Sequence, residues 1–270
     1  MKGIQWALIC ALFLSLGISK VHAQQKVVNA TVLLSQKTAP DNQQLIRALK
    51  SQWKVQVDSL VISDKTLVFN SFGGCTVMVA YLDYPAPTDE TGAAAKLSWI
   101  WRNGMDIALR HQAQVVISVI GPASKTMDLY KIMTQTTAAV LEVTKAPAVF
   151  QNAQYLLHDA GYFTTAAQNM VTNQSLPIYC WVYFGRPGEG NGFTFGLTEF
   201  DLPEMEIQGS AYSESEVHAT LVEATLTVLK FNTKLSDGQT FVTEEGTNLL
   251  VKFGKSAFVP DGQTVIQLEY

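Results

Sequence analysis

Apolar positions change their spacing several times between residues 31 and 120. Thr31–Leu34 predicts a short strand, and the apolar residues after it recur at helical spacing behind the capping pair Thr38 and Asp41. Two strand-like runs then flank Gly73-Gly74, a turn signal that favours a hairpin. The predicted elements are a strand at 31–34, a helix reaching Trp53, strands at 67–69 and 76–80, a helix at 99–109 and a strand at 114–120.

The order of these elements, β-α-β-β-α-β, is that of the ferredoxin-like split βαβ arrangement. A long helix from about Ser124 to Val143 leads to a second series that roughly repeats the first. We therefore expect an α+β fold of two ferredoxin-like halves, 24–146 and 147–270, packed as one unit. The second series comprises strands at 148–150, 178–184, 193–197, 204–207, 249–253 and 264–268, a helix at 163–171, and a helix opened by a Ser213/Glu216 capping box.

Residues 1–23 have the features of a cleavable signal peptide. A positive Lys2 precedes an apolar run from Ile4 to Ile18, and Val21-His22-Ala23 supplies the small residues of a cleavage site. A membrane-spanning helix needs about 20 apolar residues, and this run is shorter. We expect cleavage after Ala23, export to the periplasm or the extracellular space, and no membrane anchor on the mature chain.

The chain is acidic, with 19 basic and 23 acidic side chains and a formal net charge of −4. Loss of Lys2 and Lys20 with the signal peptide makes the mature chain more acidic still. This balance argues against nucleic acid or an anionic membrane surface as a partner. Cys75 and Cys180 are the cysteines that remain after residue 23, and both lie in apolar runs. Export permits a disulfide between them, whereas burial as free thiols is the alternative.

Residues 199–206 contain four carboxylates, a group that suits a hard cation or an acid/base pair. Strand alternation puts Glu204 and Glu206 on one face and Met205 and Ile207 on the other. A half-exposed strand has the same pattern. Because the segment holds neither a calcium loop nor a histidine, we expect Glu204 and Glu206 to form a solvated face.

His111, His158 and His218 are the histidines of the mature chain, and no two have the spacing of metal ligands on a helix. We expect structural roles for them and no metal. Gly121–Thr126 stands between a strand and a helix and ends in Lys-Thr, like a phosphate loop. It lacks the glycines that such a loop needs at 119 and 124, so we expect Ser124 to cap a helix and no cofactor to bind.

The hairpin around Gly188–Gly192 carries aromatic residues on its first strand. Alternation predicts that Trp181 and Tyr183 share one face, with Val182 and Phe184 on the other. If the first face borders a groove, the two rings offer a large contact area with polar tips. If it borders the core, they are packing residues.

Several short motifs are spaced over residues 170–268: Leu176-Pro177, Trp181-Val182, Gly196-Leu197, Phe200, Glu204–Ile207 and Asp237–Thr240. Together they resemble the bacterial domain of unknown function family DUF4261. Upstream, Trp101 and His111–Gln114 are similar to a further segment of such proteins, where the resemblance implies a second histidine at the position of Gln114. These motifs identify a fold and imply no reaction.

The sequence therefore favours an exported, non-catalytic binding or interaction module with a protein or small-molecule partner. The candidate binding residues are Trp181, Tyr183, Glu204, Glu206 and His111. The alternative is a hydrolase-like or metal-assisted enzyme in which folding brings a histidine to the acidic strand. A histidine beside Glu204 or Glu206 would favour the enzyme, and a carboxylate row facing solvent would favour the module.

Overall fold

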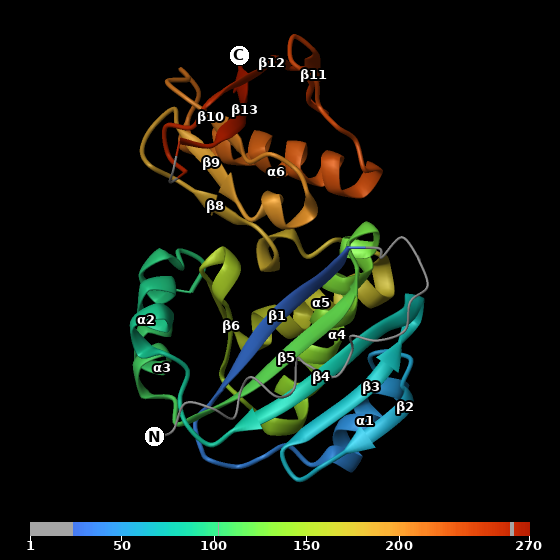
Figure 1. Cartoon of the computed structure of the whole chain (residues 1–270). Coiled ribbons are helices and arrows are strands. Elements are labelled where there is room, and N and C mark those ends of the chain that lie inside the picture. The colour runs from blue at the N-terminus through green and yellow to red at the C-terminus, as the bar shows by residue number, and fades with distance from the viewer. Residues whose placement is uncertain (1–23, 102, 260–261) are drawn as a thin grey trace, which may run out of the picture.

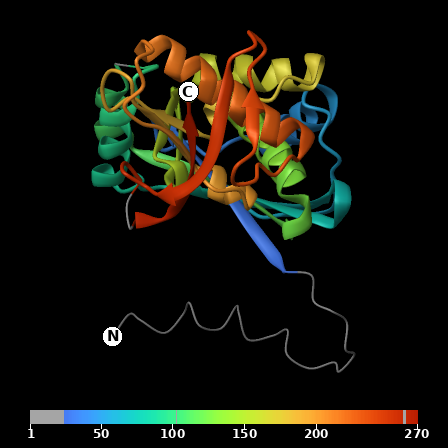
Figure 2. The same ribbon diagram turned by 90° about the horizontal axis from the view of Figure 1, so that it is seen from above.

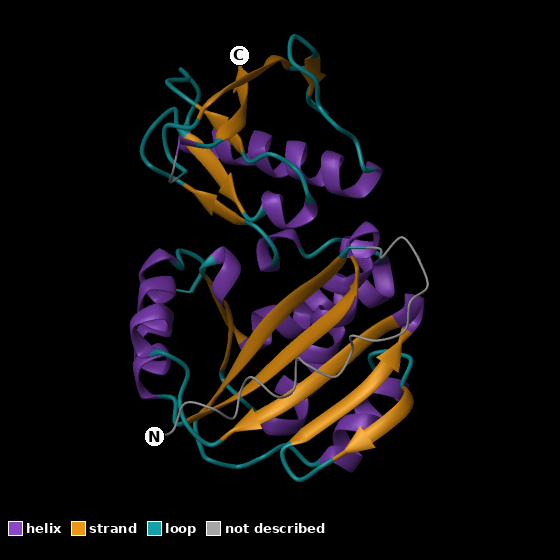
Figure 3. Cartoon of the chain, in the orientation of Figure 1, coloured by secondary structure: helices purple, strands orange, loops and turns teal. Residues whose placement is uncertain are grey.

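The computed structural model describes residues 24–101, 103–259 and 262–270. The predicted signal peptide and its cleavage site therefore lie outside the described residues. The described chain forms two β-sheets with helices packed against them (Figures 1 and 3). Within the described part, no helix combines the length and apolar character needed to cross a bilayer.

The first sheet has seven strands in the order β2-β3-β4-β5-β1-β6-β7, and every neighbouring pair is antiparallel. The long strand β1 pairs with β5 over its whole length. The strands are β1 (Gln25–Leu34), β2 (Asp58–Ile62), β3 (Thr66–Ser71), β4 (Cys75–Leu82), β5 (Ala113–Pro122), β6 (Ala148–Gln151) and β7 (Leu156–Asp159).

Helices cover the two faces of this sheet unequally. Helices α1 (Asn42–Ser51), α4 (Thr126–Thr144) and α5 (Ala160–Asn173) lie behind the sheet in Figure 1, where alternate residues of β1 and β5 join them in the main core. Helices α2 (Thr88–Leu97) and α3 (Gly104–Arg110) pack over Leu33, Phe150 and Leu157 in a smaller cluster. Since Leu33 alternates with Val32 and Leu34, this smaller cluster lies on the opposite face.

The second sheet has six strands in the order β11-β12-β13-β10-β9-β8, and β10 runs parallel to β13. Helix α6 (Glu214–Phe231) packs against β8, β9 and β10. Seen from above in Figure 2, α6 and the last strands lie over the end of the first sheet. The strands are β8 (Tyr183–Gly185), β9 (Gly192–Phe195), β10 (Met205–Ile207), β11 (Thr240–Val242), β12 (Asn248–Lys255) and β13 (Thr264–Glu269).

The mixed α+β fold is confirmed, but the ferredoxin-like halves are not. A ferredoxin-like unit places its first strand between its third and fourth strands, whereas here β4 pairs directly with β5 and β1 lies on the far side of β5. The chain also changes sheet later than residue 146, because β6 and β7 extend the first sheet and α5 packs on α4. The crossing to the second sheet occurs between residues 174 and 182.

One continuous cluster of buried apolar side chains includes residues from both sheets. The two cysteines belong to it, and both Cys75 and Cys180 are buried free thiols. Burial raises the pKa of each thiol. Both cysteines therefore act as small core residues, and the disulfide that export would permit is not formed.

Candidate functional site

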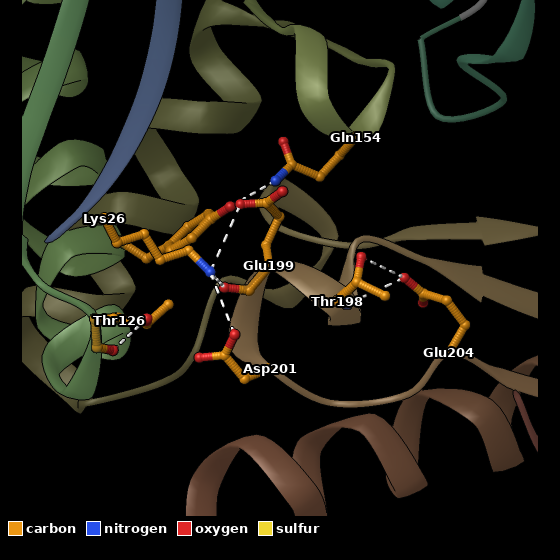
Figure 4. A network of polar contacts seen from close by, with 9 residues as sticks. Lys26, Thr126, Gln154, Thr198, Glu199, Asp201 and Glu204 are labelled. Atoms are coloured by element: carbon orange, nitrogen blue, oxygen red, sulfur yellow. Dashed lines mark hydrogen bonds and ion pairs between the residues drawn. The ribbon is translucent and has the colours of Figure 1, made fainter. Parts of the chain in front are cut away.

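Glu204 is a buried residue whose carboxylate is fully hydrogen-bonded. Thr194 Oγ1 donates to its Oε2 at 2.8 Å, and the amides of Gly196 and Thr198 donate to Oε1 at 2.7 and 3.2 Å. Figure 4 shows the contact with Thr198. Gly196 has a φ of 121°, and a side chain there would meet Trp181 O, so glycine suits this turn. The carboxylate fixes the turn after β9.

Glu206, the middle residue of β10, has a similar environment. The amides of Ala257 and Phe258 donate to its two oxygens at 3.0 and 3.3 Å, and Ser256 Oγ also donates to it. The side chain is 0% exposed. The prediction of a solvated carboxylate face is therefore wrong, because the loop at 256–258 and the turn at 194–198 cover it. Of the histidines that the structure describes, none hydrogen-bonds to either carboxylate.

Trp181 lies in the core between the two sheets rather than on a groove wall. It is 0% exposed, and its Nε1 donates to Thr134 Oγ1 of α4 at 2.9 Å. Its ring packs edge-on to Tyr130 at 5.7 Å between centroids. Tyr183 is half-buried and packs against Phe193. The two rings do not continue one strand, since β8 begins only at Tyr183 after a 3₁₀ turn.

His111 and His158 are both buried, and neither hydrogen-bonds to Glu204 or Glu206. His111 Nδ1 is 3.0 Å from Ala108 O, and burial lowers its pKa. His158 is stacked on Tyr162, and neither of its ring nitrogens has a hydrogen-bond partner among the described residues. Burial lowers the pKa of His158 to about 4. Both side chains are therefore neutral at pH 7.

His218 belongs to an aromatic cluster that sequence reasoning missed. Its Nε2 is 2.9 Å from the Tyr179 hydroxyl, and Trp99 packs edge-on to the imidazole. The Arg186 guanidinium lies 4.1 Å from the Trp99 ring centroid and pairs with Glu214 at 3.1 Å. Burial, together with the Arg186 charge, lowers the pKa of His218 to about 4. The cluster joins the segment after α2 to α6, which no local motif could indicate.

A polar network also crosses between the sheets (Figure 4). Lys26, near the start of β1, donates to the carbonyl of Glu199 and lies 3.9 Å from the carboxylates of Glu199 and Asp201. Beside it, Gln154 Nε2 donates to the Tyr130 hydroxyl at 2.6 Å. Burial raises the pKa of Tyr130, so the phenol stays protonated. Part of the acidic run is thus paired with an amino-terminal lysine.

The prediction that Ser124 caps a helix is wrong, although a helix does begin two residues later. Helix α4 begins at Thr126, whose Oγ1 donates to Ala123 O at 2.7 Å. Ser124 falls within a preceding 3₁₀ turn and provides no side-chain cap. Lys125 donates to the carbonyl of Gly73 at 3.1 Å, so its ammonium is directed toward the β3–β4 turn.

A groove lies between the helices of the two sheets, and we name it the inter-sheet groove. It comprises a hollow of about 500 Å³ between α4 and α6 and an adjoining one of about 480 Å³ toward α5, which share Met127, Leu229 and Lys230. A smaller hollow of about 280 Å³ continues past Lys234. The first two lie within the usual size range of ligand sites, about 300 to 1,000 Å³.

The groove combines an apolar floor with a basic rim. Four lysines line its first two hollows, Lys54, Lys131, Lys230 and Lys234, against a single carboxylate, Asp201. None of the predicted binding residues lines it. Sequence reasoning missed it because Lys54 and Lys131 are far in the chain from Lys230 and Lys234. Among the described residues, no three of His, Cys, Asp and Glu are close enough to hold a metal ion.

Comparison with known proteins gives one assignment. A family model described as "Domain of unknown function (DUF4261)" matches residues 193–269, which run from β9 to β13. No match was found among curated proteins or solved structures. The matched range contains Glu204 and Glu206 and excludes Trp181, Tyr183 and His111. Residues 193–269 of this chain therefore match the DUF4261 family, a domain of unknown function.

Proposed function

We propose that the mature chain is an exported, non-catalytic binding module and that its ligand occupies the inter-sheet groove. The observation that carries this proposal is a lysine-rimmed apolar groove on a chain with a net charge of −4. Export is supported by the signal-like segment 1–23, and release without an anchor follows from the predicted cut after Ala23.

The environment of the acidic strand supports binding over catalysis. A general acid or base must reach the proton of a substrate. Glu204 and Glu206 instead accept hydrogen bonds from backbone amides and hydroxyls inside the region that matches DUF4261, and both are at most 1% exposed. Their carboxylates hold loops in place. The groove offers contact area and charge that these residues do not.

Site-specific photo-crosslinking tests the proposal. A benzophenone amino acid replaces the half-buried Met127 on the groove floor, and a matched variant carries it at Val61, which is 64% exposed on the edge strand β2. The variants are secreted from the producing bacterium and irradiated in the exported fraction. We expect one adduct of defined mass at Met127 and none at Val61. Equal labelling at both positions, or none at Met127, would contradict a binding role for the groove.

A further inference from the structure

No carboxylate in the described part of the chain forms an ion pair with the basic rim of the inter-sheet groove. Lys131, Lys230 and Lys234 take part in no ion pair among the described residues, and Lys54 Nζ donates only to Ser51 O. Asp201, the one lining carboxylate, lies 3.9 Å from Lys26. Since unit charges of one sign repel one another, a bound anion would lower the energy of this arrangement.

The floor of the groove is apolar and adaptable. Met127 and Met170 contribute two unbranched thioether side chains, beside Val171 and Leu229. Methionine fills irregular gaps and is common on surfaces that bind amphipathic peptides. Two hollows that share a wall accept successive apolar side chains of one ligand, and the lysines stand beside both.

Resting on the proposed function, we infer that the groove binds an acidic amphipathic peptide segment of a partner protein. Its apolar side chains fill the two hollows, and its carboxylates face Lys131 and Lys230. Helix-in-groove recognition places anchors at helical spacing in this way. A nucleic acid is disfavoured because the chain is acidic outside this rim. A lipid surface is disfavoured because it needs an outward, flat apolar face, whereas the floor of this groove is recessed.

The test uses synthetic probes and the mature full chain. The acidic probe is a fluorescent peptide of about 15 residues with leucines at helical spacing and glutamates between them. A second probe has glutamine in place of every glutamate, and a third has serine in place of every leucine. Fluorescence anisotropy should show binding of the acidic probe and at least about tenfold weaker binding of the other two. Raising the salt from about 0.1 M to about 1 M shortens the Debye length from about 10 Å to about 3 Å and should weaken binding.

Variants locate the site. The double variant Lys131→Gln, Lys230→Gln should bind the acidic probe about fivefold more weakly, because one exposed ion pair changes affinity by a factor of about 1.5 to 5. Lys96→Gln removes an exposed lysine of α2 outside the groove and should leave affinity unchanged. An unchanged melting temperature in all variants shows that folding is intact.

Three results would overturn the inference. The first is binding of the glutamine probe as tight as that of the acidic probe, and the second is a loss of affinity in Lys96→Gln equal to that of the double variant. The third is sedimentation with phosphatidylglycerol vesicles that depends on Lys131 and Lys230 while the acidic probe does not bind. These failures differ from failure of the proposed function. A non-peptide adduct on the benzophenone at Met127 would refute the peptide and retain the binding module. An absence of any adduct there would refute the module itself.

Discussion

Trp181 of the segment before β8 donates its indole hydrogen to Thr134 of α4, and this 2.9 Å bond joins the two sheets inside the core. The same ring contacts Tyr130 of α4, which packs on the first sheet, and Phe200, which lies between β9 and β10 of the second sheet. The tryptophan therefore contributes both apolar burial and a specific hydrogen bond to the packing of one sheet on the other.

Replacing Trp181 with alanine should lower the free energy of unfolding by about 3 to 5 kcal/mol, because a large buried ring is lost and a cavity remains. Trp181→Phe keeps most of the apolar contact but leaves the Thr134 hydroxyl without its donor, and should cost less. Urea denaturation of both variants measures the difference. A loss below about 1 kcal/mol for the alanine variant would contradict the core position, since exposed sites rarely exceed about 0.5 kcal/mol.

Glu206→Gln should destabilise the fold by about 1 to 3 kcal/mol. Glutamine keeps the shape but replaces one accepting oxygen with a donor, so at least one of the amides at Ala257 and Phe258 loses its partner. Glu245→Gln, at an exposed turn position, is the matched control and should have almost no effect. Thermal unfolding of the two variants beside the parent chain checks this. Equal stability of all three would mean that Glu206 is solvated after all.

His158 should make the protein less stable in acid. Its pKa is about 4 in the folded state, against an ordinary value of 6.5, so the unfolded chain binds the proton first. Stability is therefore complete above about pH 6.5 and falls as the pH drops toward 4. The full loss from this side chain is of the order of 3 kcal/mol. The variant His158→Gln lacks this titrating imidazole, so its free energy of unfolding should vary less between pH 6.5 and 4 than that of the parent protein. An identical pH profile in both proteins would disprove the assignment.

The two buried thiols predict a simple titration. Native mature protein should not react with a thiol reagent within minutes, because burial raises the pKa of Cys75 and Cys180 and blocks access. In denaturant without reductant both should react. A disulfide would leave neither reactive. Retention of the signal peptide would add a third cysteine, Cys10, to the count in denaturant, so the same titration reports processing.

Long periodic elements could be predicted from the sequence. The helix expected from Ser124 to Val143 is α4, Thr126–Thr144, and the capping box of Ser213 and Glu216 forms with both reciprocal hydrogen bonds. Helix α2 was missed because its buried positions at 91–95 are small residues without a large apolar stripe. Sheet order was also beyond prediction, because it depends on pairing between strands far apart in the chain.

The candidate site could be predicted only in part. Alternation suggested a shared face for Glu204 and Glu206, but it could not show that other segments cover both carboxylates. The covering segments lie about 10 residues before Glu204 and 50 residues after Glu206. The groove lysines come from three separate parts of the chain, the loop after α1, helix α4, and the end of α6 with the loop that follows it, so tertiary structure brings them together.

The position of Lys26 affects how the protein should be produced. This lysine lies two residues after Gln24, the predicted first residue of the mature chain, and the Gln24 carbonyl accepts a hydrogen bond from Ala123, a residue of the groove lining. A recombinant form that starts at Val27 would lose the ammonium that bridges to Glu199 and Asp201. An affinity tag fused directly to Gln24 would emerge beside the groove and compete with any ligand there. Fusion at Tyr270, which does not line the groove, avoids both effects.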